Sequence, residues 1–168
     1  VLAASGLSEE DLRCPPDLPY GDQARIDYLA TGGEPSRIIM NCSGKHAGML
    51  ATCAVNGWAA DGYLQPEHPL QIHIREVAER LVGERATATA VDGCGAPVFA
   101  MSLAGLAKAI HRIGTSSERS PFALHRSAGA LVGRYVMSHS AGLFFVLVAA
   151  ATEPHMGAFG GQLLNQDS

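Results

Sequence analysis

The sequence contains no apolar run long enough to cross a membrane. Its longest run, from Ala141 to Ala151, is much shorter than the ~20 residues that a transmembrane helix needs. The first residues also lack the charged, apolar and small-residue segments that together make up a signal peptide. These absences argue against a membrane partner and against secretion.

Positive charge is scarce as well. The chain has 12 Lys and Arg residues against 16 Asp and Glu residues, which gives a formal net charge of -4 at pH 7. No basic cluster follows a predicted helix or loop, whereas proteins that bind nucleic acid present basic patches to the phosphates. We therefore expect no nucleic-acid partner.

Cysteine is sparse and evenly scattered. The four cysteines stand at positions 14, 42, 53 and 94, and no two of them form a Cys-x-x-Cys pair. This spacing excludes the dense pattern of a disulfide scaffold and the paired pattern of a zinc ribbon. We expect reduced thiols and a cytoplasmic protein.

The composition that remains is that of one packed domain. Of 168 residues, 47% are apolar and 17% are charged, which is typical of a globular protein. Apolar periodicity together with capping residues predicts several helices. Their expected starts are Ser8, Asp22, Lys45, Pro69, Ser102 and Pro121.

Two of these helices carry apolar residues at helical spacing. In the helix capped by Asp22, the apolar residues Ile26, Leu29 and Ala30 share one side, before Gly32 and Gly33 end it. The helix capped by Ser102 presents Leu103, Leu106, Ala107 and Ile110 in the same way. The helices from Lys45 and from Pro69 should end at Gly57 and Gly83, respectively.

Two short segments have the character of strands. Ile38–Met40 is a brief apolar run that predicts a buried strand, and Thr87–Val91 alternates polar and apolar residues. The strands do not alternate regularly with the helices, as they would in a doubly wound parallel sheet. The expected fold class is therefore α+β.

Three residues at glycine-flanked turns could converge in space: Cys42, Lys45 and Cys94. Thiolates bind zinc, and a positive charge from Lys45 or a helix N-terminus would lower the pKa of a nearby thiol. Spacing alone leaves the alternative open that Cys42 and Cys94 are small buried hydrophobic residues. In the same way, Asp92 before Gly93 is often the acceptor of its own turn.

The segment around Lys45 also admits two other interpretations. Ser43-Gly44-Lys45 resembles part of a phosphate-binding loop, but Ile39 and His46 occupy positions where that motif needs Gly and Ser or Thr. Ser43 could act as a nucleophile with a lysine base, although a helix-capping serine is more common. A single histidine such as His46 in a first helical turn is usually a packing or capping residue.

Two segments together carry a resemblance to a known family. Asn41–Leu50 (NCSGKHAGML) and Val91–Pro97 (VDGCGAP) resemble the two signature segments of the rhizobial-type L-asparaginases. The resemblance spans roughly residues 1–135, with support from Leu7–Cys14, Gly62–Leu64, Glu67–Pro69 and Leu103–Ala107. It implies a fold similar to that of serine β-lactamases and glutaminases, with helices packed on a mainly antiparallel sheet.

The resemblance also implies a function. Members of the family are amidohydrolases that convert L-asparagine to L-aspartate and ammonia. Residues Cys42, Lys45 and Cys94, hereafter the metal trio, match a zinc site that tunes the pocket and does not perform hydrolysis. Cys42 and Asp92 are implied in substrate binding. A lysine that ligates zinc must be neutral, so we expect the pKa of Lys45 to be depressed.

The catalytic residues of the family are not among those matched here. The resemblance implies that a Ser-x-x-Lys pair upstream supplies the nucleophile, so this chain alone is expected to be inactive. We expect residues 1–137 to be the middle portion of the domain and 138–168 to be a divergent tail. An inactive domain that binds zinc or a small amide is the alternative, and a homodimer is possible.

Overall fold

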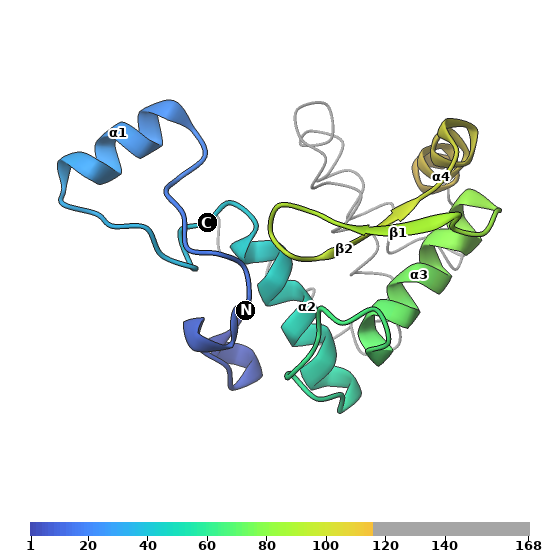
Figure 1. Cartoon of the computed structure of the whole chain (residues 1–168), viewed down its shortest axis with the longest axis horizontal. Helices are drawn as coiled ribbons and strands as arrows, with labels where there is room; N and C mark the ends of the chain where they lie inside the picture. The colour runs from blue at the N-terminus through green and yellow to red at the C-terminus, as the bar shows by residue number, and fades with distance from the viewer. Residues whose placement is uncertain (116–168) are drawn as a thin grey trace.

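The fold combines helices with one small antiparallel sheet, which confirms the α+β class. A computed structural model describes residues 1–115 (Figure 1). Two short 3-10 helices come first, η1 at Ala3–Ser5 and η2 at Glu9–Asp11. Four α-helices follow: α1 at Asp22–Ala30, α2 at Ser43–Asn56, α3 at Pro69–Val82 and α4 at Leu103–Thr115. Two strands lie between α3 and α4 in the sequence: β1 at Ala88–Val91 and β2 at Pro97–Ala100.

The predicted helix start at Ser8 is confirmed as a single capped turn. The Ser8 hydroxyl accepts a hydrogen bond from the backbone N–H of Glu10, and the Ser8 N–H donates to Asp11 Oδ2 at 2.8 Å. This reciprocal capping box satisfies two N–H groups that the turn would otherwise leave exposed. It directs the chain into the core, where Leu12 and Cys14 are fully buried.

Helix α1 has the predicted bounds, and its apolar side is exposed. Figure 1 shows α1 set apart from α2, α3 and α4, and none of its residues is buried. Ile26 and Leu29 are 60% and 49% exposed. Asp22 is the first helical residue, and the N-cap position belongs to Gly21, which makes no side-chain cap. The short apolar stripe therefore faces no other described element.

The predicted strand at Ile38–Met40 is wrong, because these residues form a turn. Ser36 takes up their backbone donors: its hydroxyl accepts from the N–H of Ile39 at 3.3 Å, and its carbonyl accepts from the N–H of Met40 at 3.2 Å. Short polar side chains compete with a sheet ladder in this way. Ile38 is left 45% exposed, while Met40 turns into the core.

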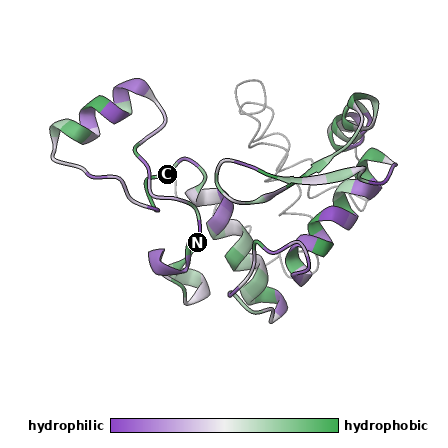
Figure 2. Ribbon diagram, viewed as in Figure 1, coloured by the Kyte–Doolittle hydropathy of each residue, from purple (hydrophilic) through white to green (hydrophobic). Residues whose placement is uncertain are grey.

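Helices α2 and α3 supply most of the hydrophobic core. Both end at the predicted glycines, Gly57 and Gly83, whose φ angles of 68° and 77° are left-handed. Pro69 opens α3, and the side chain of His68 caps it by accepting from the N–H of Leu70. In Figure 2, α3 alternates between hydrophilic and hydrophobic residues, as an amphipathic helix does. The fully buried residues of the two helices include Met49, Leu50, Leu70, Ile74, Val77 and Leu81.

Helix α4 packs against α3 and leaves two of its expected apolar residues exposed. Leu103 and Ile110 are 85% and 51% exposed, whereas Ala109 and Ile113 are buried. Gly105 lies on the buried side, and a β-carbon there would come within 3.2 Å of Val82 Cβ. The helices approach closely at Gly105 and Ala109, where small residues occupy the contact, and Ile113 is buried further along the same helix.

Strands β1 and β2 form an antiparallel hairpin that reaches toward α2 (Figure 1). The predicted strand at Thr87–Val91 is confirmed to within one residue. The hairpin turn, residues 92–96, lies where the second signature segment was recognised. Likeness to serine β-lactamases stays a prediction, and the expected helix from Pro121 and the expected tail 138–168 lie outside the described residues.

No helix of residues 1–115 is long and apolar enough to span a membrane.

Candidate functional site

The first turn of α2 brings two polar side chains into the protein interior. Lys45 is 8% exposed and His46 is fully buried. Cys42 occupies the N-cap position directly before them. Burial of a lysine and a histidine requires hydrogen-bond partners for both, and the hairpin turn between β1 and β2 supplies them.

The first partner is Asp92, which forms an ion pair with Lys45. Lys45 Nζ lies 2.5 Å from Asp92 Oδ2, across 47 residues of sequence. Burial alone would lower the pKa of Lys45, but hydrogen bonds to Asp92 and Cys94 outweigh it and raise this pKa. The expected depression of the Lys45 pKa concerns a lysine beside a metal ion, and it stays a prediction. The lysine is held as an ammonium group.

Asp92 also organises the turn that contains it. Its Oδ1 atom accepts hydrogen bonds from the N–H of Cys94 at 2.9 Å and from the N–H of Ala96 at 3.0 Å. Gly95 adopts the left-handed φ of 89° that closes the turn. Burial works to raise the pKa of Asp92, but hydrogen bonds from Cys94 and Lys45 lower it to about 2. Asp92 is thus both the acceptor of its own turn and the counter-ion of Lys45.

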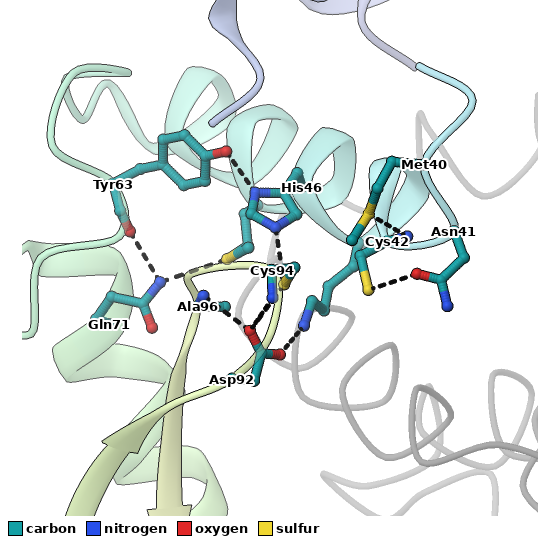
Figure 3. Close-up of polar contacts among 11 residues, drawn as sticks. Met40, Asn41, Cys42, His46, Tyr63, Gln71, Asp92, Cys94 and Ala96 are labelled. Carbon is teal, nitrogen blue, oxygen red and sulfur yellow. Dashed lines mark hydrogen bonds and ion pairs between the residues drawn. The ribbon is translucent and has the colours of Figure 1, made fainter. Parts of the chain in front are cut away.

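Cys94 is held on two sides. Its thiol donates to Asp92 Oδ1 at 2.9 Å, and its sulfur lies 3.0 Å from His46 Nε2 (Figure 3). The residue is only 2% exposed. Burial, together with the hydrogen bond to Asp92, raises the pKa of the Cys94 thiol to about 11. At neutral pH Cys94 is therefore a protonated thiol in this arrangement.

The chain of contacts continues beyond His46. His46 Nδ1 lies 2.6 Å from the Tyr63 hydroxyl, which also accepts a hydrogen bond from the N–H of Arg13 at 3.0 Å. Burial and the charge of Lys45 lower the pKa of His46 to about 4. Burial raises the pKa of Tyr63 to about 12. Both side chains are therefore neutral in the described state.

Cys42 lies at the edge of this cluster. It is partly exposed, its thiol donates to Asn41 Oδ1 at 3.1 Å, and its N–H donates to Met40 Sδ at 3.0 Å (Figure 3). The structure thus joins Lys45, Asp92 and Cys94 directly, whereas Cys42 begins the helix that carries Lys45.

The donor types of the metal trio are chemically suited to zinc, since thiolate sulfur and amine nitrogen both ligate it. Without a metal ion, however, the raised pKa values of Lys45 and Cys94 favour an ammonium group and a protonated thiol. Within residues 1–115, no three His, Cys, Asp or Glu side chains gather in a way that could hold a metal ion. Ligation by the metal trio stays a prediction.

The family model for L-asparaginase II matches residues 1–151. The chain belongs to the L-asparaginase II family. No curated protein sequence matches it. At the level of the family, the protein is an asparaginase-type amidohydrolase, and both signature segments lie inside the matched range.

Within this L-asparaginase II family member, sequence reasoning missed the roles of His46 and Tyr63. A signal for burial of His46 did exist, since it precedes Met49, Leu50 and Cys53 at helical spacings of three, four and seven. For Tyr63 there was no such signal. Its hydroxyl meets His46 and the N–H of Arg13 only through the tertiary fold.

Proposed function

We propose that this protein hydrolyses L-asparagine to L-aspartate and ammonia, with the cluster around Lys45 and Asp92 forming one wall of the substrate pocket. The observation that carries the proposal is the meeting of the two signature segments. They lie 47 residues apart in sequence, yet one ion pair joins them. Family membership supplies the reaction class.

The charges of the cluster suit an amino-acid substrate. L-Asparagine carries an ammonium group and a side-chain amide, both of which donate hydrogen bonds. The Asp92 side chain is 29% exposed, so its carboxylate retains an edge that can accept from such a donor. Cys42 is partly exposed and is the N-cap residue of α2. Its thiol is proposed as a second contact.

We also propose that the metal trio holds a zinc ion that tunes the pocket. When bound, zinc fixes the positions of its ligands and adds positive charge beside the substrate. Cys42, Lys45 and Cys94 must each give up a proton to serve as ligands. The neutral Lys45 amine then keeps two N–H groups, which can still donate to Asp92. Asp92 would then remain beside the ligands as a hydrogen-bond acceptor.

The hydrolytic nucleophile is not assigned to any residue of this sequence. No Ser-x-x-Lys arrangement occurs in it, and burial holds the Cys94 thiol at a pKa of about 11, which is far from that of an activated cysteine. The second candidate function is a domain that binds zinc or a small amide without hydrolysing it.

Ammonia release from L-asparagine separates the two candidates. We expect no release above buffer from this chain by itself, because acyl-enzyme chemistry needs an activated nucleophile. Joined to a family-like upstream segment with Ser-x-x-Lys and a completed C-terminal half, the protein should become active. A folded but inactive joined protein would sink the hydrolase proposal.

The matched control for this assay is Ser43→Ala. If this chain alone released ammonia and lost that activity on Ser43→Ala, Ser43 and Lys45 would be the catalytic pair and the upstream nucleophile would be unnecessary. Elemental analysis of Cys42→Ser and Cys94→Ser variants tests the zinc proposal. Zinc content equal to that of the parent in both variants would refute it.

The remaining proposals concern the surroundings of the protein. All four cysteines are free thiols, which supports a reducing compartment such as the cytoplasm. A homodimer is proposed alongside the small-molecule substrate, and light scattering of the purified chain tests it.

A further inference from the structure

The hydrogen bonds at the Tyr63 hydroxyl have only one consistent direction. Tyr63 is fully buried, and among the described residues its hydroxyl contacts two groups, the N–H of Arg13 and Nδ1 of His46. The Arg13 N–H can only donate, so it occupies an acceptor position of the hydroxyl oxygen. The hydroxyl proton then has one place to go, the ring nitrogen Nδ1 of His46.

This direction fixes the tautomer of His46. A nitrogen that accepts from Tyr63 carries no proton, so the neutral ring carries its hydrogen on Nε2. That nitrogen lies 3.0 Å from the sulfur of Cys94. The imidazole therefore donates an N–H to the sulfur, while the thiol proton of Cys94 goes to Asp92 Oδ1 at 2.9 Å.

The arm formed by Tyr63 and His46 is itself held firmly. Gln71 Nε2 on α3 donates to the carbonyl of Tyr63 at 2.8 Å and fixes its backbone. The His46 and Tyr63 rings meet edge to face, with centroids 5.7 Å apart and an interplanar angle of 82°. Both His46 and Tyr63 are completely inaccessible to solvent. The arm therefore joins α3 and the N-terminal segment to the turn that carries Cys94.

We propose that Tyr63 and His46 are positioning residues for the Cys94 sulfur: Tyr63 fixes the His46 tautomer, and His46 supplies the N–H donor that holds the sulfur in place. If Cys94 rotated to another rotamer, the hydrogen bonds to His46 and Asp92 would break and leave buried polar groups unsatisfied. The position of the sulfur is thus fixed before any ligand binds. Its role as a zinc ligand rests on the proposed function.

The tautomer can be observed directly in the zinc-free chain. In ¹H–¹⁵N correlation spectra of the histidine ring, we expect the proton of His46 on Nε2 in the parent protein. Tyr63→Phe should give a mixture of tautomers, because Nδ1 loses its donor. Tyr28→Phe removes a hydroxyl that donates to the Glu34 carbonyl, outside this arm, and should leave the spectrum unchanged. A parent protein with its proton on Nδ1 would overturn the proposal, as would an unchanged tautomer in Tyr63→Phe.

Zinc affinity supplies the functional measurement. Loss of a side chain that orients a metal ligand lowers metal affinity by about 10- to 100-fold. We expect a loss in that range for His46→Leu, whereas His46→Gln places an amide N–H near the Nε2 position and should stay within about threefold of the parent, well under that range. Equal losses in the Gln and Leu variants would contradict a donor role and indicate packing alone.

The two measurements, the His46 tautomer and the zinc affinity, separate this inference from the proposed function. A chain that takes up no zinc refutes the zinc proposal, and the tautomer measurement then decides the positioning role by itself. If Tyr63→Phe does not fold, the tautomer of the parent protein alone still tests the direction of the hydrogen bonds. A proton on Nδ1 in the parent would be sufficient to reject it.

Discussion

Replacing Asp92 with asparagine isolates the charge of this carboxylate from its role in the turn. An Asn side-chain oxygen can still accept from the N–H groups of Cys94 and Ala96, which Asp92 Oδ1 does now. What the substitution removes is the negative charge beside the Lys45 ammonium. Because Lys45 has a side chain only 9% exposed, that ammonium has little access to water as a replacement.

Two estimates give the loss in free energy of unfolding for Asp92→Asn. Breaking a fully buried ion pair costs about 3–5 kcal/mol, but this pair is partly open, since the Asp92 side chain is 29% exposed. The pKa of Asp92 falls from 3.8 to about 2, and at ~1.4 kcal/mol per pKa unit this sets an upper value of about 2.5 kcal/mol. Allowing for solvent screening, we expect Asp92→Asn to lower the free energy of unfolding by about 2 kcal/mol.

Urea unfolding followed by circular dichroism at pH 7 measures this change, with the m-value expected to stay constant. Lys45→Met should cost less, about 1 kcal/mol, because Asp92 keeps its backbone donors. The double variant should be more stable than the sum of the two losses predicts, by about 1 kcal/mol or more. Asp27→Asn, at an exposed carboxylate that accepts from Gln23, is the control and should change stability by less than about 0.5 kcal/mol. Additive losses in the double variant would show that the ion pair carries no coupling energy, and the reasoning would fail.

Three further outcomes follow from the same cluster. Because the folded-state pKa of Asp92 is depressed to about 2, its contribution to stability should be complete above about pH 4 and disappear as the pH falls toward 2, an acid loss that Asp92→Asn should lack in urea titrations. Zinc uptake by the metal trio should increase from pH 6 to pH 9 in equilibrium dialysis, because Lys45 and Cys94 must lose protons to bind; uptake independent of pH would exclude them as ligands. Gly95→Ala should lower stability by about 1–2 kcal/mol because φ is 89° there, whereas Gly93→Ala, where an added β-carbon meets nothing within 4 Å, should have a smaller effect.

The sequence predicted helices well where local signals were complete. The helix over Pro69–Val82 has a proline in its first turn, apolar residues at helical spacing and a glycine at its end, and all three signals point to the same element. At Ile38–Met40 the apolar side chains favoured a strand, but Ser36 accepts hydrogen bonds from the backbone N–H groups of Ile39 and Met40. The pattern of apolar side chains gives no sign that Ser36 competes with a neighbouring strand for these N–H groups.

In the candidate site, too, the sequence predicted what local signals carry and missed what depends on tertiary contacts. The signature segments identified Lys45, Asp92 and Cys94, and the fold brings these three together. The spacing of the residues could not show that Lys45 is an ammonium group, because its charge depends on a carboxylate 47 residues away. The connection from His46 to Tyr63 was equally beyond local reasoning, since it needs α2 and the segment before α3 to be already packed together.

The contacts that build this cluster also bear on how the chain folds. The pairs Lys45 with Asp92, His46 with Cys94 and Arg13 with Tyr63 join residues 47, 48 and 50 positions apart. Contacts of this separation require large loops to close, whereas α2 and α3 form from neighbouring residues. We therefore expect the helices to form first and the hairpin turn to dock onto α2 late, after the transition state. Variants at Cys94 should then accelerate unfolding while leaving the rate of folding nearly unchanged.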